Sequence, residues 1–422
     1  MGKLSTIACI LAGPVLVYSG LIYYYGVNFP FLDDYDTILA HLLLPAGEQI
    51  ANWFSPHNEH IHWVLRATAS LDAKLFGEVN LVRLMWVGEV FFILFYLIFI
   101  SSIQQRNIPW LWLIPLPLFL FQPSYWGTVT WATTSLHNFP GILFAFSAFF
   151  LWAQPKPWQK GCAILFLISA LFTHGFGLAA LIAVLLWEGH ALYISFRNRP
   201  RTIVSPSLVR ISILLVVLSL WILFKTNLTG PSGTESLETL DIFQATHFIT
   251  NFIGSCIHFL GAPWITILAL IEIGLLVWLT KKGLARKNPE LYFFILYLFL
   301  CAALTTIARA DMGPKQGLAS RYRIFSTLLI CSQYLGFVQL YWKKWSRLPH
   351  FFPSTLGLAL LFYGYSLFVN TNNLNKIRVR LIEDRIRWIE GGDLQEYPDA
   401  DRANRILTDA EKSGVFSVRD TQ

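Results

Sequence analysis

Long apolar runs alternate with short polar segments along most of the 422-residue chain. A helix that crosses about 30 Å of hydrocarbon needs about 20 mainly apolar residues. Runs of this length predict an all-α polytopic membrane protein with about 11 transmembrane helices. The predicted spans cover residues 4–25, 81–103, 108–122, 139–153, 161–173, 178–196, 211–225, 264–280, 291–308, 322–342 and 351–369.

Three segments outside these spans have patterns of their own. Residues 61–75 and 377–389 carry apolar stripes at helical spacing, which predicts amphipathic helices outside the cytoplasm, the second ended by Gly391 and Gly392. Residues 245–262 are apolar but interrupted by polar side chains. We therefore expect an interfacial or re-entrant helix there, in place of a twelfth span.

Basic residues accumulate in alternate connections, and this asymmetry predicts the orientation. Connections rich in Lys and Arg face the cytoplasm. The N-terminus is then expected inside, and the tail, residues 370–422, outside. The transmembrane domain, residues 1–369, has a first outer loop at 26–80 that we expect to be catalytic. The basic residues of the inner connections are Lys3, Arg106, Lys156, Lys160, Arg197, Arg199, Arg201, Arg210, Lys281, Lys282, Arg286, Lys287, Lys343, Lys344 and Arg347.

The composition supports a membrane protein and excludes several other classes. Hydrophobic residues make up 55% of the chain and charged residues 14%, against about 25% charged in soluble domains. The net charge of +7 lies in short loops and not on one stripe, so nucleic acid is not an expected partner. Five cysteines without CxxC or Cys/His spacing argue against a disulfide framework or a structural zinc site. Because GxGxxG and P-loop motifs are absent, an enzyme here would need an activated substrate in the membrane.

The densest acidic cluster follows the first span and contains Asp33, Asp34 and Asp36. Three neighbouring carboxylates repel one another, so raised pKa values, a bound cation or pairing are expected. Such a group can act as general base for a hydroxyl nucleophile, with Asp33 and Asp34 catalytic and Asp36 binding substrate. The alternative is that Asp34 or Asp36 caps the helix that follows.

A histidine-rich segment lies further along the same loop. His57, Glu59 and His60 can bind a divalent cation or orient a phosphate or sugar hydroxyl. If a metal is used, Mg²⁺ or Mn²⁺ is the candidate, with Asp33, Asp34, His57 and Glu59 as its candidate ligands. The sequence does not require a cofactor. The alternative is a polar cap on the helix at 61–75.

The third cluster is basic and lies between the two apolar runs at 291–308 and 322–342. Arg309, Lys315 and Arg321, followed by Tyr322, are predicted to bind substrate. Arginine forks match phosphate oxygens bidentately. The alternative is that the arginines extend to the membrane interface.

Other polar residues lie within the spans or near their outer ends. Glutamates inside spans are costly where they face lipid, so each is expected to face protein. Residues near the outer ends of spans are interpreted as lining residues. The glutamates are Glu89, Glu188 and Glu272, and the lining residues are Trp126, Trp131, His137, Asn138 and His174.

Together these features resemble the GT-C-fold glycosyltransferases, polytopic membrane enzymes that use polyprenyl-phosphate-linked sugars. The resemblance covers most of the layout: the Asp33-Asp34-Tyr35-Asp36 motif, the amphipathic helices after it and the number of spans. The segments 56–60 and 320–322 are similar to motifs of bacterial membrane proteins assigned to that group. The chain departs from some members in lacking a large globular C-terminal domain.

The resemblance implies a mechanism and a location. Asp33, or else Asp34, would be the base or a cation ligand, and Arg309 and Arg321 would hold the lipid phosphate. The partners would be a polyprenyl-phosphate-linked sugar donor, a glycan or lipid acceptor, and membrane lipids. The location would be the bacterial inner membrane, with the chemistry on the extracytoplasmic face.

Two other functions fit the same residues. An O-antigen ligase or polymerase-like enzyme would depend on Arg and His more than on the aspartates. A transporter or flippase for a lipid-linked saccharide would bind through the same charges without reaction. Transporters usually place ionisable groups near the bilayer midplane, whereas here they are expected at the outer surface.

Overall fold

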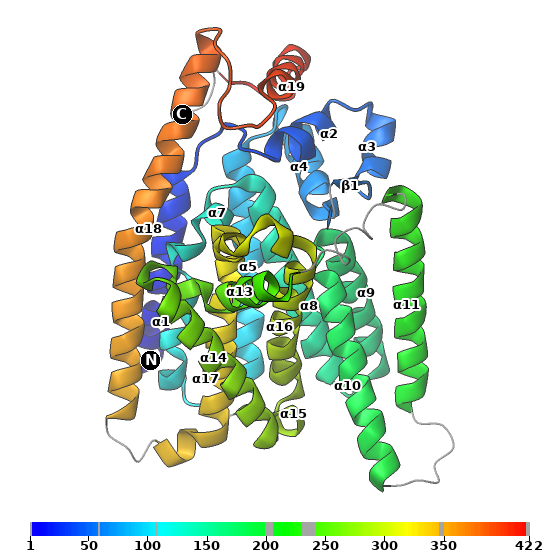
Figure 1. The fold of residues 1–422 in the computed structure, drawn as a ribbon, viewed down its shortest axis with the longest axis vertical. Coiled ribbons are helices and arrows are strands. Elements are labelled where there is room, and N and C mark those ends of the chain that lie inside the picture. The colour runs from blue at the N-terminus through cyan, green and yellow to red at the C-terminus, as the bar shows by residue number, and fades with distance from the viewer. Residues whose placement is uncertain are drawn as a thin grey trace. The chain divides into compact units, whose positions relative to one another are not determined.

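The computed structural model describes residues 2–57, 60–106, 108–198, 206–229, 241–345 and 350–418, and most of them are helical (Figure 1). Contacts divide the chain into two compact units, and the division passes through two helices, α5 and α8. The first unit contains Met1–Leu97, Pro109–Leu143 and His350–Gln422, and the second contains Ile98–Ile108 and Phe144–Pro349.

The first unit contains both ends of the chain. Beside its helices, a two-stranded antiparallel hairpin pairs His57 with His60 and is the one sheet among the described residues. The elements are α1 (Gly2–Tyr25), η1 (Tyr35–Leu39), α2 (Ala40–Leu42), α3 (Ala46–Asn52), β1 (Pro56–His57), β2 (His60–Ile61), α4 (Trp63–Phe76), the start of α5 (Leu81–Gln104), η2 (Trp110–Leu113), α6 (Pro115–Leu120), η3 (Pro123–Tyr125), α7 (Trp126–Val129), the start of α8 (Ala132–Ala153), α18 (Phe351–Ile389) and α19 (Ala400–Ser413).

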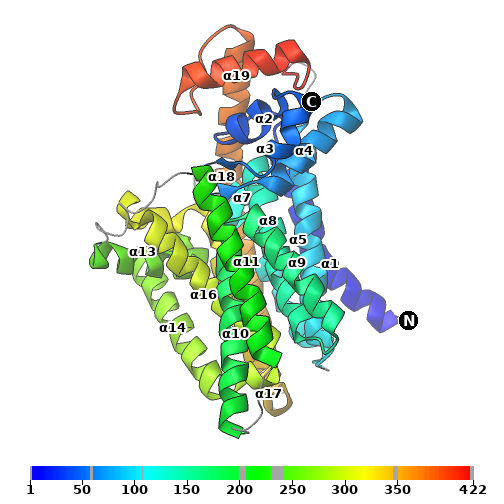
Figure 2. The ribbon, with the colours of Figure 1, turned by 90° about the vertical axis from the view of Figure 1, so that its right-hand side faces the viewer.

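The second unit is helical throughout its described residues. Figure 2 shows α10 and α11 side by side in this unit. The elements that begin in it are α9 (Pro157–Thr173), α10 (Gly177–Asn198), α11 (Pro206–Thr229), α13 (Ile242–Gly254), η4 (Ser255–Leu260), α14 (Ala262–Lys281), α15 (Leu284–Lys287), α16 (Pro289–Arg309), η5 (Ala310–Met312), η6 (Pro314–Leu318), η7 (Ser320–Tyr322) and α17 (Arg323–Trp345).

Eight helices in the described part of the chain are long and apolar enough to cross a membrane. The protein is therefore an integral membrane protein, as the hydropathy pattern predicted. The eight segments are Leu81–Gln104, Ala132–Ala153, Gly177–Arg197, Pro206–Thr226, Ala262–Lys281, Pro289–Met312, Ser320–Lys344 and Phe352–Ile389.

The predicted count of about 11 spans is not confirmed. Residues 108–122 do not form one helix, because prolines divide them into η2 and the six-residue α6. Six residues rise about 9 Å, far less than the hydrocarbon thickness. The helix at 161–173, α9, has 17 residues and is not among the eight. Helix α1 coincides with the expected span at 4–25 but is also not among them.

Helix α18 has 39 residues, which corresponds to about 58 Å, nearly twice the hydrocarbon thickness. It joins the span predicted at 351–369 and the amphipathic helix predicted at 377–389, so residue 369 lies inside one continuous helix. It ends at Ile389, and Gly391 follows with φ +80°. Near Tyr24, α18 lies beside α1 (Figure 1), with the Arg378 guanidinium 4.9 Å from the tyrosine ring.

The glutamates expected to face protein do so. Glu89, Glu188 and Glu272 are exposed by only 1%, 2% and 1%. In the second unit, Arg210 donates to both carboxylate oxygens of Glu188 at 2.9 Å, and Trp152 Nε1 donates at 2.7 Å. A buried charge thereby gains a charged partner, as a low-dielectric environment requires.

Helix α13 agrees with the prediction that residues 245–262 do not form a twelfth span, and their interfacial or re-entrant position stays a prediction. Its 13 residues rise about 20 Å, too little to cross the bilayer. It packs against α14, α16 and η6 within the second unit.

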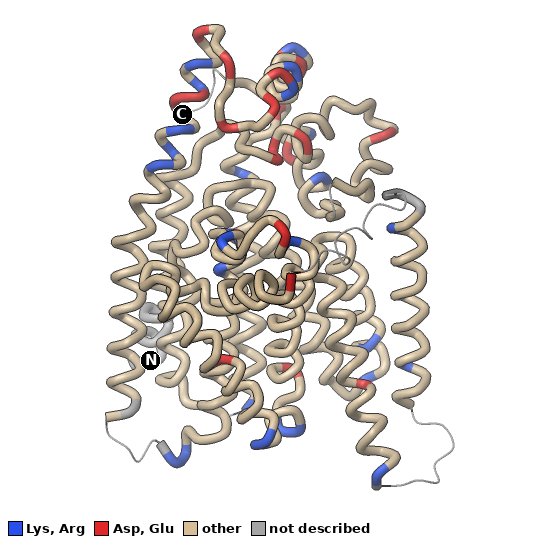
Figure 3. The backbone as a smooth tube through the Cα atoms, in the orientation of Figure 1, with Lys and Arg blue, Asp and Glu red and all other residues tan. Residues whose placement is uncertain are grey.

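Charged residues are unevenly distributed within each unit. In the first unit they gather at the end that holds α19, the last turns of α18 and the acidic loop, residues 31–36 (Figure 3). In the second unit α16 has 21 residues, about 31 Å in length. Lys281, Lys282, Arg286 and Lys287 precede this helix, and the basic segment 309–321 begins with Arg309 at its last position. The two basic groups are therefore separated by about one hydrocarbon thickness.

Candidate functional site

The acidic loop follows α1 and has an unusual backbone. Leu32 has φ +45° and is the one non-glycine residue with positive φ among the described residues. A π-helical turn, η1, then begins at Tyr35. Positive φ in a residue such as leucine costs energy, and single π turns occur often at functional sites. The loop that carries these carboxylates therefore has a strained residue and a π-helical turn, neither of which an ordinary helix N-terminus requires.

Asp34 is buried and has a structural role in the loop. Its side chain is 1% exposed and accepts hydrogen bonds from Phe31 N at 3.1 Å and Thr133 N at 3.0 Å. Thr133 Oγ1 donates to it at 2.6 Å. Burial raises the pKa of Asp34 to about 7, although these hydrogen bonds favour the charged form. Asp34 makes no side-chain cap to the following helix, so the capping alternative is wrong for this residue.

Asp36 is held by the tail. Arg402 Nη2 donates to its Oδ1 at 2.5 Å, and Tyr397 Oη donates to its Oδ2. Burial and the neighbouring Asp36 carboxylate raise the pKa of Tyr397 above its usual range. Asp36 therefore fastens α19 and its preceding loop to the acidic loop, instead of capping a helix.

Asp33 is the carboxylate of the three that remains open to solvent. Its side chain is 45% exposed, and its Oδ1 lies 3.8 Å from His57 Nε2. The backbone carbonyl of Asp33 accepts hydrogen bonds from Thr37 N at 2.8 Å and Thr37 Oγ1 at 2.6 Å. The main chain is therefore fixed while the carboxylate stays accessible. This combination is suited to proton transfer from a substrate hydroxyl.

The predicted histidine segment forms the hairpin β1–β2. Its entry is fixed by Arg66, whose Nη1 donates to the carbonyl oxygens of Asn52 and Ser55 at 2.5 Å each. His57 faces Asp33, whereas the predicted Glu59 lies outside the described residues. The residue that precedes α4, His62, makes no side-chain cap, so the observed contacts do not support a capping role for that residue.

The helix after this hairpin, α4, confirms the helix predicted over residues 61–75. Val64 and Leu65 are buried within the first unit, whereas Leu71, Leu75 and Phe76 are exposed. Exposed apolar side chains on the last two turns are consistent with contact to the membrane surface.

The cationic loop, residues 309–323, belongs to the second unit. Arg309 ends α16, exposed Lys315 lies in η6, and the Arg321 guanidinium lies 5.0 Å from the centre of the Tyr322 ring. Tyr322 itself is buried, with its ring 5.3 Å from Phe252 of α13. The tyrosine thus anchors the loop, and its neighbouring arginine stacks beside it.

Helix α13 supports this loop closely. Asn251 Nδ2 donates to Pro314 O at 2.9 Å, and a Cβ added to Gly317 would lie 2.6 Å from the carbonyl oxygen of Phe248. Arg323, which was not among the predicted site residues, donates to Leu318 O and hydrogen-bonds His258 Nε2, each at 3.0 Å. The backbone of the predicted phosphate-binding loop is therefore rigidly held. The acidic loop belongs to the first unit and the cationic loop to the second. The catalytic role predicted for the aspartates and the phosphate binding predicted for the arginines therefore need separate tests.

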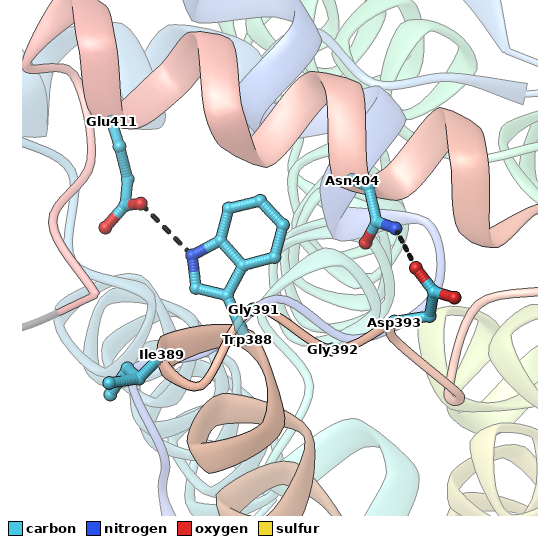
Figure 4. Close-up of a pocket in the computed structure, with 7 residues that line it drawn as sticks. All are labelled: Trp388, Ile389, Gly391, Gly392, Asp393, Asn404 and Glu411. Atoms are coloured by element: carbon cyan, nitrogen blue, oxygen red, sulfur yellow. Dashed lines mark hydrogen bonds between the residues drawn. The ribbon is translucent and has the colours of Figure 1, made fainter.

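The tail forms a cavity of about 330 Å³ between the end of α18 and α19. Figure 4 shows the Trp388 indole between Glu411 and Asn404. Trp388 Nε1 donates to Glu411 Oε2 at 3.1 Å, and Asn404 Nδ2 donates to Asp393 Oδ1 at 3.0 Å. None of the predicted site residues lines this cavity.

The sequence pattern does not identify two hydrogen-bond partners of the aspartates, Thr133 and Arg402. Thr133 lies in an ordinary polar stretch at the start of α8, and Arg402 is 366 residues from Asp36. His137, predicted as a lining residue, also lies beside His60 and His62. These contacts join residues that are far apart in the sequence, so they can be identified only when the fold is known.

Comparison of the chain with protein-family models, with curated proteins and with solved structures returned no match. Functional assignment therefore depends on the residues and their geometry.

Proposed function

We propose that the protein is a membrane glycosyltransferase that moves a sugar from a polyprenyl-phosphate donor to a glycan or lipid acceptor on the extracytoplasmic face. Asp33 would be the general base. The proposal depends on the different environments of the three aspartates in the acidic loop. Asp34 and Asp36 form structural hydrogen bonds, whereas the Asp33 side chain is accessible to solvent.

The proposed reaction is one displacement. The Asp33 carboxylate takes the proton of an acceptor hydroxyl as that oxygen attacks the anomeric carbon of the sugar. The bond between the anomeric carbon and the phosphate oxygen breaks, and polyprenyl phosphate leaves with the electron pair. General-base assistance of this kind contributes about 10²–10⁴-fold in rate.

His57 supports this assignment of Asp33. Its Nε2 lies 3.8 Å from the carboxylate, too long for a hydrogen bond in the free enzyme, although such contacts often tighten when substrate binds. Arg309, Lys315 and Arg321 stay predicted ligands of the lipid phosphate, since arginine stabilises charge on a leaving phosphate.

Purified protein supplied with polyprenyl-phosphate sugars and an acceptor extract tests the proposal. The Asp33→Asn variant should lose about 10²–10⁴-fold in turnover while its affinity for the lipid donor changes little. Asp401→Asn is the matched control, because it removes an exposed carboxylate from the same unit. Turnover of Asp33→Asn equal to that of the control would reject the assignment of the base.

The same preparation distinguishes the rival functions. Donor binding by the wild type without turnover for any acceptor would favour a lipid-linked saccharide transporter. Arg321→Ala is expected to weaken donor binding, and undiminished binding would remove Arg321 from the phosphate site. Loss of turnover on chelation, restored by Mg²⁺ or Mn²⁺, would establish a cation requirement.

A further inference from the structure

Four of the chain's ten histidines gather within the first unit. His57 and His60 face each other on the hairpin, His62 follows it, and His137 comes from α8. The ring centres of His60 and His137 are 4.8 Å apart, those of His62 and His137 are 4.5 Å apart, and those of His60 and His62 are 6.1 Å apart. His62 and His137 are buried, with exposures of 4% and 7%.

We propose that His60, His62 and His137 bind a transition-metal ion of the zinc class. A zinc–nitrogen distance of about 2.0–2.1 Å places an imidazole centre about 3.2 Å from the ion, and two tetrahedral ligands then have ring centres about 5.2 Å apart. The three observed separations lie on both sides of that value.

The ring planes of the three histidines are inclined to one another and not parallel. The planes of the three pairs meet at 61° to 75°, and imidazole lone pairs lie in the ring plane. Parallel stacked rings would direct those lone pairs away from a shared ion. His60 and His137 offer ring nitrogens within 4.8 Å of each other. Rotation of a ring about its Cβ–Cγ bond exchanges nitrogen and carbon positions while the ring centre stays almost fixed.

The ligand chemistry selects the class of metal. Imidazole nitrogen suits Zn²⁺, Co²⁺, Ni²⁺ and Cu²⁺, whereas Mg²⁺ and Mn²⁺ prefer carboxylate and carbonyl oxygen. This site is therefore different from the Mg²⁺ or Mn²⁺ site predicted from Asp33, Asp34, His57 and Glu59. It also stands without the proposed transferase activity, because metal binding is measured without turnover.

His57 connects the cluster to the acidic loop. Its ring centre is 5.9 Å from that of His62, and its buried Nε2 lies 3.8 Å from Asp33 Oδ1 without a hydrogen bond to any described residue. His57 therefore lies in contact range of both the proposed ligand His62 and the Asp33 carboxylate.

Metal binding to the chelator-treated full-length protein tests the proposal. We expect one Co²⁺ per chain with the visible absorption of a tetrahedral site, displaced by Zn²⁺ and not by Mg²⁺. The double variant His62→Phe/His137→Phe keeps two aromatic rings but removes two ligand nitrogens, so it should lose Co²⁺ binding. His247→Ala, which removes an exposed histidine of α13, should bind as the wild type does.

Two results would overturn the inference. They are the absence of stoichiometric Co²⁺ binding by the wild type, and equal Co²⁺ binding by the Phe double variant and the wild type. Should the double variant fail to fold, single His62→Phe and His137→Phe variants with wild-type unfolding temperatures replace it, and each should bind Co²⁺ at least about tenfold more weakly. Failure of the Asp33 assay leaves these binding results unchanged, so the two proposals can be rejected separately.

Discussion

Asp34 should make the stability of the protein depend on pH in a direction opposite to that of most surface carboxylates. Its side chain is almost fully buried beside Thr133, and burial outweighs three hydrogen bonds that favour the charged form. Replacement of Asp34 by Asn keeps the shape of the group and removes its ionisation. The Asn variant therefore mimics the protonated aspartate at every pH.

The magnitude follows from the two pKa values. The pKa of Asp34 rises from 3.8 to about 7 on folding, and each unit corresponds to about 1.4 kcal/mol. The contribution of Asp34 to the free energy of unfolding is greatest below about pH 4. It is lost as the pH rises through 7, because the folded state then holds a buried charge. The loss is about 4 kcal/mol.

Unfolding temperatures of the purified protein in detergent, followed by tryptophan fluorescence from pH 4 to pH 8, test this reasoning. Wild type and Asp34→Asn should unfold at similar temperatures at pH 4, and the variant should be the more stable protein at pH 8. Asp311→Asn removes an exposed carboxylate and should follow the wild type throughout. A constant difference between wild type and Asp34→Asn at all pH values would refute the assignment of a buried, ionising Asp34.

Three further predictions concern packing. Arg402→Ala removes a half-exposed cation from the tail, so limited proteolysis should cut the tail faster, with a loss of about 1 kcal/mol in its docking. Arg210→Ala leaves buried Glu188 without its cation and should cost about 3–5 kcal/mol in unfolding free energy, partly restored by Glu188→Gln. A methyl group at Gly177 would lie 2.3 Å from the backbone of α9, so Gly177→Ala should lower the unfolding temperature by the equivalent of about 1–3 kcal/mol. Gly189→Ala adds its methyl group to open space inside helix α10, so that temperature should stay unchanged or rise, because alanine favours the helix.

The sequence by itself determined the features that depend on the summed hydrophobicity or local conformation of neighbouring residues. Apolar runs predicted an integral membrane protein, because the cost of burying a segment in lipid adds up residue by residue. The same reasoning predicted that Glu89, Glu188 and Glu272 face protein, and that a helix ends before Gly391. It failed at 108–122, where hydropathy is high but prolines divide the segment, since hydropathy does not count backbone hydrogen bonds.

Only the tertiary structure decided what each polar residue does. Three aspartates within four positions look equivalent in the sequence, yet Thr133 holds one, Arg402 holds another, and Asp33 stays accessible. Likewise, His62 and His137 become neighbours only when the hairpin meets the start of α8. Desolvation and partner choice depend on residues far along the chain, and no local pattern contains that information.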